Sequence, residues 1–183
     1  MTLAIMQPYL FPYIGYWQLI NAVDVFVIFD DVNFIKKGYI NRNLILVGGK
    51  SQQFTLELIG ASQNKLINEI EVGNNSQKLL KTIEMSYKKA PYFDNVYPII
   101  EDILNNKEKN LAKFIGYSLE QISSYLKLNT KFIYSSDIEK DNSLKAQDKI
   151  LDICKKLNAT SYMNAIGGQE LYSKEIFKEN GIE

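Results

Sequence analysis

Two uninterrupted apolar runs near the N-terminus constrain the fold of this chain more than any other feature. Residues 3–6 (LAIM) and 25–29 (VFVIF) contain no polar position, which is typical of strands buried on both faces of a parallel sheet. Between them, Ile14, Trp17 and Ile20 recur at helical spacing. Strand, helix and strand in this order predict an α/β fold.

The middle of the chain breaks this pattern with a hairpin and three helices. The run NLILVGGKSQQFTLEL places Gly48 and Gly49 between two β-prone segments, and consecutive glycines supply the positive φ angles of a tight turn. Helical patterns follow near residues 76–89, 92–106 and 109–126. We therefore expect an antiparallel hairpin addition and a helical segment at residues 75–126, both within a single α/β domain of residues 1–183.

The parallel pattern resumes towards the C-terminus. KFIYSS and SYMNA are typical of strands, and the helix expected between them in SLKAQDKILDICKKL has Ser143 as its N-cap. A last helix is expected from about Gln169 to Glu179, directly after Gly167 and Gly168. The predicted fold class is α/β, with a mostly parallel, Rossmann-like sheet, an antiparallel hairpin addition and an inserted helical segment.

Charge and the scarcity of two residue types exclude several classes of function. Lys plus Arg and Asp plus Glu both number 21, so the net charge is zero and no overall field attracts nucleic acid or an anionic membrane. The absence of histidine excludes His-dependent nucleophilic catalysis and argues against zinc. The single cysteine, Cys154, lies on an apolar helical side, so we expect a buried thiol. Without a leader-like or membrane-spanning run, we expect a cytoplasmic protein with no membrane insertion.

The ends of four expected strands are the candidate site. Ligands of open α/β sheets bind at the carboxyl edge, where strands end and helices begin. Four segments of this kind are present, namely QPYLFPYIGY, DDVNF, SSDIEKDNS and NAIGGQ. From these and the adjoining FIKKGYINRN, the catalytic candidates are Asp30 and Asp31, and the ligand-binding candidates are Gln7, Phe11, Tyr13, Lys36, Asn41, Arg42, Asn164, Gly167 and Gly168.

Asp30 and Asp31 directly follow a buried strand. Adjacent residues of an extended chain point in opposite directions, so we expect one functional carboxylate and one that caps a turn. The functional carboxylate would act as a general base toward an amine or hydroxyl, or would hold Mg²⁺ with a phosphate. Gln7, directly after the first strand, either binds a ligand through its amide or fixes the turn before Pro8.

Two segments are candidates for holding a phosphate. Arg42 offers a planar fork suited to phosphate, with Lys36 and Asn41 close in sequence. Gly167 and Gly168 precede the last expected helix, so their N–H groups are candidates for holding an anion. Neither GxGxxG nor a Walker-type P-loop occurs, which disfavours a conventional dinucleotide site or NTPase.

Longer blocks of the sequence resemble the WbqC-like protein family. These blocks are IMQPYLFPYIGYWQLINAVDVFVIFDDVNFIKKGYINRN, ASQNKLINEIE, SYKKAPYF and ATSYMNAIGGQELYSKEIFKENGIE. The resemblance covers essentially the whole chain. The family's QP, DD and NR motifs and its late glycine turn match Gln7 and Pro8, Asp30 and Asp31, Asn41 and Arg42, and Asn164, Gly167 and Gly168. Many relatives carry His where this chain has Met6, and relatives tend to continue past Glu183.

The family is associated with bacterial surface-polysaccharide gene clusters, including O-antigen loci, so the resemblance implies a sugar-modifying step. We expect a transferase that acylates or aminoacylates the amine of a nucleotide-linked amino sugar. Its partners would be the nucleotide sugar and an acyl donor, with no cofactor and no metal. Asp30 or Asp31 would take the amine proton, Arg42 and the glycine turn would hold the diphosphate, and an aromatic side chain such as Phe11 or Tyr13 would stack on the base.

Two alternatives stay open. FPYIGY faintly resembles the phenylalanine-proline and glycine-histidine tip of adenylyl-transferring α/β enzymes, with Tyr16 in place of the histidine. The first alternative is therefore a nucleotidyltransferase-like activity that uses Mg²⁺. The second is a noncatalytic protein that binds nucleotide sugars or acts as a scaffold in glycan assembly.

Overall fold

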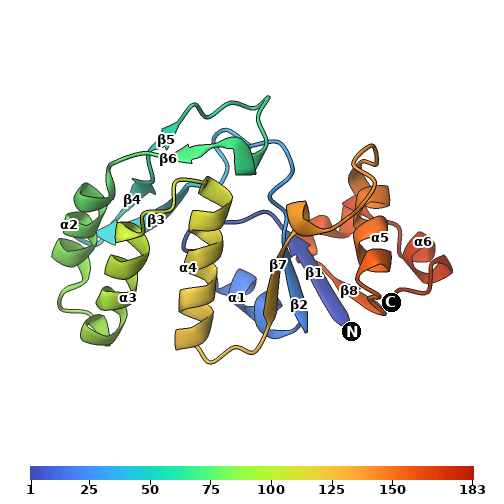
Figure 1. Ribbon diagram of the computed structural model, residues 1–183. Helices are drawn as coiled ribbons and strands as arrows, with labels where there is room; N and C mark the ends of the chain where they lie inside the picture. Colours follow the sequence, from blue (N-terminus) through green and yellow to red (C-terminus); the bar gives the residue numbers. More distant parts are fainter. The chain divides into compact units, whose positions relative to one another are not determined.

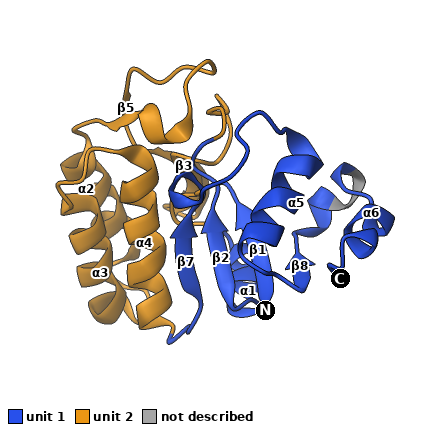
Figure 2. Ribbon diagram, turned by 45° about the vertical axis from the view of Figure 1, so that its right-hand side comes forward, with its two compact units in different colours: residues 1–7, 13–31, 127–183 blue, residues 8–12, 32–126 orange. Residues whose placement is uncertain are grey.

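The computed structural model describes residues 1–168 and 171–183, and these form two compact units that are described separately (Figure 2). Unit 1 contains Met1–Gln7, Tyr13–Asp31 and Lys127–Glu183, and unit 2 contains Pro8–Pro12 and Val32–Leu126. The expected helical segment at 75–126 therefore belongs to unit 2. That the whole chain forms a single domain stays a prediction.

Unit 1 is built on a four-stranded parallel sheet. Its strands are β1 (Thr2–Met6), β2 (Val25–Ile28), β7 (Lys131–Tyr134) and β8 (Ser161–Met163), and they lie in the order β7-β2-β1-β8 (Figure 1). β1 pairs in parallel with both β2 and β8, and β2 pairs in parallel with β7. The predicted α/β fold with a mostly parallel sheet is confirmed.

Helices pack on both faces of this sheet. On one face, the Tyr16 ring of α1 (Ile14–Asn21) lies 5.3 Å from the Phe26 ring of β2. The neighbours of Phe26 in the strand point the other way. There they pack against α5 (Ala146–Lys156) and α6 (Lys174–Glu179). The core on this second face comprises Leu3, Ile5, Val25, Val27, Ile150, Leu151, Ile153, Cys154, Ala159, Phe177 and Ile182.

The order of the strands reverses once within the sheet. The chain passes from β1 through α1 to β2 on one side of β1, and later returns from β7 through α5 to β8 on the other side of β1. The reversal therefore lies between β1 and β8. Gln7 directly follows β1, and Asn164 directly follows β8, so these two residues stand at the carboxyl ends that border it.

Unit 2 contains the expected hairpin and the three expected helices. β3 (Arg42–Val47) pairs antiparallel with β4 (Lys50–Thr55) through a turn in which Gly48 and Gly49 have φ angles of +57° and +76°. β5 (Leu58–Ile59) pairs with β6 (Glu71–Val72), next to the short 3-10 helix η1 (Ile67–Glu69). The helices are α2 (Ser76–Tyr87), α3 (Phe93–Asn105) and α4 (Leu111–Tyr125), and α3 packs against both others.

Two predicted helix starts are wrong. Ser143 does not cap α5, because its hydroxyl donates to the nearby Asp141 carboxylate at 2.6 Å, and α5 begins at Ala146 with Lys145 as N-cap. The last helix, expected to follow the glycines directly, is preceded by the 3-10 helix η3 (Ile166–Leu171), and α6 begins only at Lys174. The predicted first residue of that helix, Gln169, lies outside the described residues.

Two further predictions concern membrane-spanning helices and the burial of Cys154. Within residues 1–168 and 171–183, no helix combines the length and the apolar character needed to span a membrane. Cys154 is fully buried, as expected, and its burial raises the pKa of the thiol to about 12. The thiol therefore stays protonated near neutral pH and acts as a core residue.

Candidate functional site

The carboxyl ends of the parallel strands bring several of the predicted residues of unit 1 to one edge of the sheet. Gln7 follows β1, Asp30 and Asp31 follow β2, and Asn164 follows β8. The main-chain oxygen of Gln7 accepts a hydrogen bond from the Tyr16 hydroxyl at 2.8 Å. Its side-chain amide has no hydrogen-bond partner within the described part of the chain, so it can still donate to and accept from a ligand.

Asp30 ties the end of β2 to the end of β7. Its two carboxylate oxygens accept from the main-chain N–H of Ser136 at 2.9 Å and from the Ser136 hydroxyl at 2.6 Å. Ser136 lies in the 3-10 helix η2 (Ser135–Asp137), directly after β7. The carboxylate thus holds the η2 turn against the neighbouring strand, while remaining at the edge where ligands of such sheets bind.

Asp31 is held by two lysines from later parts of unit 1. Its Oδ2 lies 2.8 Å from Nζ of Lys140 and 3.1 Å from Nζ of Lys149, and the Lys149 ammonium also donates to the main-chain oxygen of Asp31 at 3.3 Å. Lys140 donates in addition to the main-chain oxygen of Ser135. The Lys149 ammonium lies 5.4 Å from the centre of the Phe29 ring, a distance suited to a cation–π contact.

The lysines decide the ionisation state of Asp31. Burial alone would raise the pKa of its carboxyl, but the Lys140 and Lys149 ammonium groups, together with the nearby Ser135 hydroxyl, outweigh burial and lower the pKa below its ordinary value of 3.8. Asp31 is therefore ionised near neutral pH and is a weak base. The Asp30 carboxylate accepts from Ser136, whereas the Asp31 carboxylate lies against the two lysines; that one of the two is functional stays a prediction.

Asn164 and Gly168 are in close contact after β8. Asn164 Oδ1 accepts from the main-chain N–H of Ala165 at 2.8 Å, which fixes the direction of its amide. A Cβ atom on Gly168 would lie 2.3 Å from Nδ2 of Asn164, whereas one on Gly167 would meet nothing within 4 Å. The two glycines lie inside η3 and do not start an α-helix. The structural basis of the predicted anion site is therefore wrong, and the proposed ligand contacts of both glycines stay predictions.

Tyr13 occupies the N-cap position of α1 without a capping hydrogen bond from its side chain, and the residue is 61% exposed. A Cβ atom on Gly15 would lie 2.4 Å from the Tyr13 ring, so the absence of a side chain at position 15 lets this ring fold back over the helix. The tyrosine is accessible, but no contact in unit 1 identifies it as a stacking platform.

Four predicted residues lie in unit 2. The Phe11 ring packs 5.9 Å from the Phe54 ring, and Lys36 is exposed. Asn41 Nδ2 donates to the main-chain oxygen of Leu56 at 2.8 Å, and Arg42 Nε donates to that of Gly38 at 2.8 Å. Both hydrogen bonds join parts of unit 2. That these four residues join the unit 1 residues at one site stays a prediction.

Lys140, Lys149 and Ser136 were missed by reasoning from sequence. Lys140 and Ser136 fall in SSDIEKDNS, a predicted strand-end segment that supplied no candidate site residue. Lys149 stands three residues after Ala146 and four before Ile153, so it lies on the apolar side of α5. A lysine on an apolar helical face signals a buried partner of opposite charge, and that signal was available.

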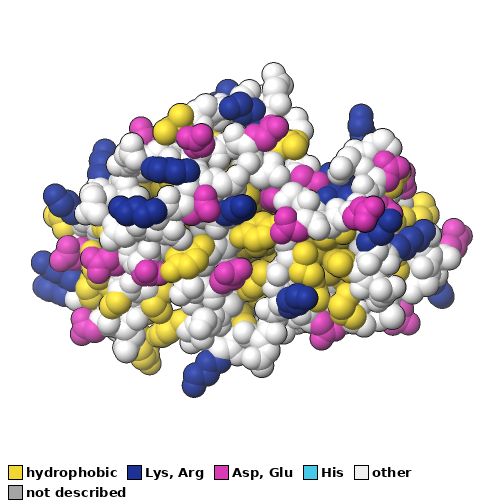
Figure 3. Space-filling view, in the orientation of Figure 1, with side chains coloured by type: hydrophobic (Ala, Val, Ile, Leu, Met, Phe, Trp, Pro, Cys, Tyr) yellow, Lys and Arg dark blue, Asp and Glu magenta, His cyan; other side chains and the backbone are white. Residues whose placement is uncertain are grey.

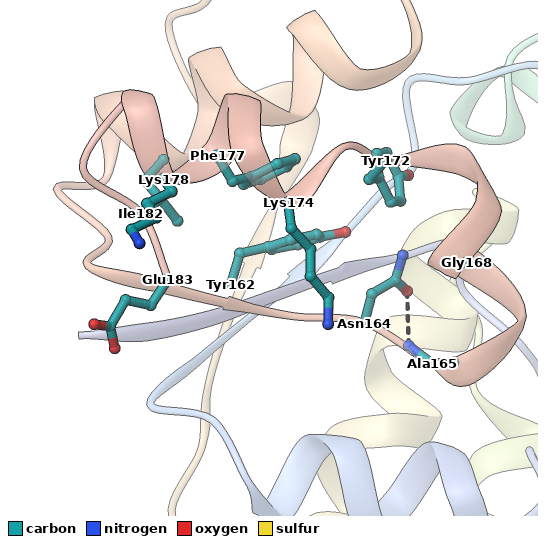
Figure 4. Close-up of a pocket in the computed structure, with 10 residues that line it drawn as sticks. All are labelled: Tyr162, Asn164, Ala165, Gly168, Tyr172, Lys174, Phe177, Lys178, Ile182 and Glu183. Carbon is teal, nitrogen blue, oxygen red and sulfur yellow. Dashed lines mark hydrogen bonds between the residues drawn. The ribbon is translucent and has the colours of Figure 1, made fainter.

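Each unit contains a cavity with a volume of about 540 Å³. The first lies in unit 1 beside β8 and beneath α6, and its lining includes Asn164 and Gly168 (Figure 4). The second lies in unit 2 between the β3–β4 hairpin and α2, and includes none of the predicted site residues. Among the described residues, no three Asp, Glu, Cys or His side chains gather as a metal site.

Charges of both signs are mixed over the surface. On the face drawn in Figure 3, Lys and Arg side chains alternate with Asp and Glu side chains over both units. This mixture agrees with the zero net charge of the chain. An anionic ligand would therefore depend on local groups and not on a large positive field.

Comparison with known proteins gives one family and one relative. Residues 7–183 match the WbqC-like protein family. A protein of Mycobacterium tuberculosis (strain H37Rv) described as "Uncharacterized protein Rv1507c" is 27% identical over 183 residues, covering 98% of this chain and 78% of that protein. No solved structure gives a significant match.

Proposed function

Because the chain belongs to the WbqC-like protein family, we propose that it is a transferase in the synthesis of bacterial surface-polysaccharide precursors. The acceptor is the amine of a nucleotide-linked amino sugar, and the donor is an activated acyl or aminoacyl group. The observation that supports a ligand site most strongly is the strand order β7-β2-β1-β8. Open parallel sheets bind ligands beyond the carboxyl ends of the strands, where such an order reverses.

Gln7 and Asn164 suit a sugar at this edge. The Gln7 amide offers one acceptor and two donor hydrogens, and none is used by the described residues. Asn164 uses its oxygen for Ala165, so its NH₂ group can donate. Sugar hydroxyl groups both donate and accept hydrogen bonds, and two amides at neighbouring strand ends match this chemistry. In this proposal they hold the sugar ring.

The two carboxylates take different roles in the transfer. An amide bond forms between the sugar nitrogen and the acyl carbon, the bond from that carbon to its leaving group breaks, and a proton leaves the nitrogen. Asp30 is the proposed proton acceptor. Asp31 is a weak base because its two lysines lower its pKa, so its proposed role is to position Lys140 and Lys149.

The test is a mass-spectrometric assay of the purified protein with UDP- and dTDP-linked amino sugars and acyl or aminoacyl thioesters. The expected product is the nucleotide sugar carrying one added acyl group on its amine. Asp30→Asn should lower the rate by about a hundredfold, the usual contribution of a general base, while sugar-nucleotide binding persists. Asp148→Asn is the matched control, because Asp148 is exposed on α5, and it should retain the full rate.

Other outcomes separate the alternatives. A strict requirement for Mg²⁺ with release of pyrophosphate would favour nucleotidyl transfer. Saturable binding of a nucleotide sugar without product from any donor would favour a noncatalytic binding protein. If no nucleotide or nucleotide sugar binds, both enzymatic functions are contradicted.

A further inference from the structure

The cavity beside β8 has a wall made of three aromatic rings. Tyr162 of β8 stacks on Phe177 of α6 with ring centres 5.2 Å apart and planes 11° apart. Tyr172 meets both rings edge-on at 6.0 Å. All three line the cavity of about 540 Å³ (Figure 4), a volume within the usual range for small-molecule sites. The rings of this wall present faces and edges that can meet a planar ring.

Neutral hydrogen-bonding groups stand next to this wall. The Tyr162 hydroxyl is buried, and among the described residues no group meets hydrogen-bond geometry with it, although Tyr172 is its neighbour. Burial, together with nearby Tyr172 and Cys154, raises the pKa of Tyr162, so the hydroxyl keeps its proton. In Figure 4 the ring points towards Tyr172 and Asn164, and the amide nitrogen of Asn164 has no hydrogen-bond partner in the described part of the chain. A ligand group that completes the hydrogen bonding of this buried hydroxyl would gain free energy.

Two ammonium groups of the cavity are candidates for binding an anion. Lys174 and Lys178 line it, and within residues 1–168 and 171–183 neither ammonium group forms an ion pair. Among the described lining residues, Glu183 contributes a carboxylate side chain beside the two lysines, and the Glu175 carboxylate also interacts electrostatically with Lys174. Figure 4 shows Lys174 extending past Tyr162 towards Asn164, with Glu183 near the opposite end. Lys174 and Asn164 line the same cavity, so both are candidates for contacting one phosphate.

We propose that this cavity binds the nucleoside phosphate portion of the nucleotide sugar, with the planar base against the Tyr162, Tyr172 and Phe177 wall and a phosphate at Lys174 and Asn164. The inference rests on the proposed function for the identity of the whole ligand. It moves the nucleotide away from Arg42 and the N-terminal aromatic residues, where sequence alone had located it. Because Asn164 also borders the strand reversal, the sugar then extends from the cavity to the carboxyl edge of the sheet.

The binding test uses nucleoside monophosphates as probes. Calorimetric titration of the purified protein with UMP, AMP, GMP, CMP and dTMP should show saturable binding for at least one of them. That nucleotide should bind at least about tenfold more tightly than inorganic phosphate or its own nucleoside, because ring and phosphate each contribute on the order of one factor of ten. Equal affinity for inorganic phosphate and every nucleotide would overturn the assignment of the ring to the aromatic wall.

Three variants locate the binding. Lys174→Gln should raise the dissociation constant of the nucleotide by about tenfold, while Lys155→Gln, an exposed lysine in the last turn of α5, should leave it unchanged. Tyr162→Phe keeps the ring wall and removes only the hydroxyl, so it should weaken binding about fivefold without lowering the melting temperature. Identical affinities for Lys174→Gln and Lys155→Gln, both folded, would overturn the proposal.

Failure of this inference is separable from failure of the proposed function. If nucleotides bind with the predicted losses in Lys174→Gln and Tyr162→Phe but no acyl product forms, the cavity assignment stands and the transferase function fails. If acyl transfer occurs while Lys174→Gln keeps the wild-type dissociation constant for the nucleotide, the transferase function stands and the cavity assignment fails.

Discussion

Loss of the Asp31 carboxylate should destabilise unit 1. Asp31→Asn leaves the Lys140 and Lys149 ammonium groups without their carboxylate. Breaking a buried ion pair on one side costs about 3 kcal/mol of unfolding free energy or more. Urea denaturation at pH 7 measures this loss. Asp148→Asn, on the exposed side of α5, should change the unfolding free energy by less than about 0.5 kcal/mol.

Asp31 also makes the stability of the folded protein depend on pH. The pKa of Asp31 is lowered in the folded protein relative to its ordinary value of 3.8. Its contribution is therefore complete above the unfolded-state pKa and is lost as the pH falls through the lower folded-state pKa. The difference in stability between the wild type and Asp31→Asn should shrink below about pH 4. A constant difference from pH 7 to pH 2.5 would contradict the ion-pair account.

Alanine substitutions at Gly167 and Gly168 form a matched pair of variants that tests the contact between Gly168 and the Asn164 amide. Gly168→Ala brings a methyl group to 2.3 Å from Asn164 Nδ2, so the amide must move and release Ala165. We expect a loss of about 1–3 kcal/mol in unfolding free energy and about tenfold weaker nucleotide binding. Gly167→Ala has open space around it and should match the wild type in both calorimetric titration and denaturation. Equal behaviour of the two variants would refute the contact.

Individual site residues were only partly predictable from the sequence. Asp30, Asp31, Gln7 and Asn164 were found because each directly follows a strand, and that position is visible in the order of residues. Their partners were not found. The Asp31 and Lys149 side chains meet although 118 positions separate them, and a contact of that range is set by packing between elements and has no local signature.

For the β3–β4 hairpin, a local sequence signal was sufficient to predict the turn. Gly48 and Gly49 take positive φ angles, which side chains disfavour by about 1–2 kcal/mol. Gly49→Ala should therefore destabilise unit 2 by about 1 kcal/mol in urea denaturation followed by circular dichroism. Ser51→Ala, exposed on β4, should change it by less than about 0.5 kcal/mol. An unchanged midpoint in Gly49→Ala would show that the turn relaxes freely.

The predicted start of α5 was wrong for a specific reason. Several polar side chains near Ser143 can accept or donate hydrogen bonds. The Ser143 hydroxyl donates to the Asp141 carboxylate and does not cap the N-terminus of α5. Short polar side chains compete between capping a helix and closing a turn, so the type of residue does not decide between them. Ser173 does cap α6, where its oxygen accepts from Ile176 at 3.4 Å.

The arrangement of the complete sheet was the least predictable feature of the molecule. Buried apolar runs identified the strands, but not their neighbours. Val25 of β2 pairs with Leu3 of β1 and also with Lys131 of β7, after the chain has passed through most of unit 2. Only the spatial order β7-β2-β1-β8 reveals the reversal beside β1, and with it the positions of Gln7 and Asn164 after two adjacent strands.

A crystal structure of the protein with a bound UDP- or dTDP-linked amino sugar tests the central claim most directly. The account predicts electron density for the sugar between Gln7 and Asn164 at the carboxyl ends of β1 and β8, with the nucleotide in the cavity lined by Tyr162 and Lys174. A ligand ordered instead only in unit 2, for example in the cavity beside the β3–β4 hairpin, would contradict it.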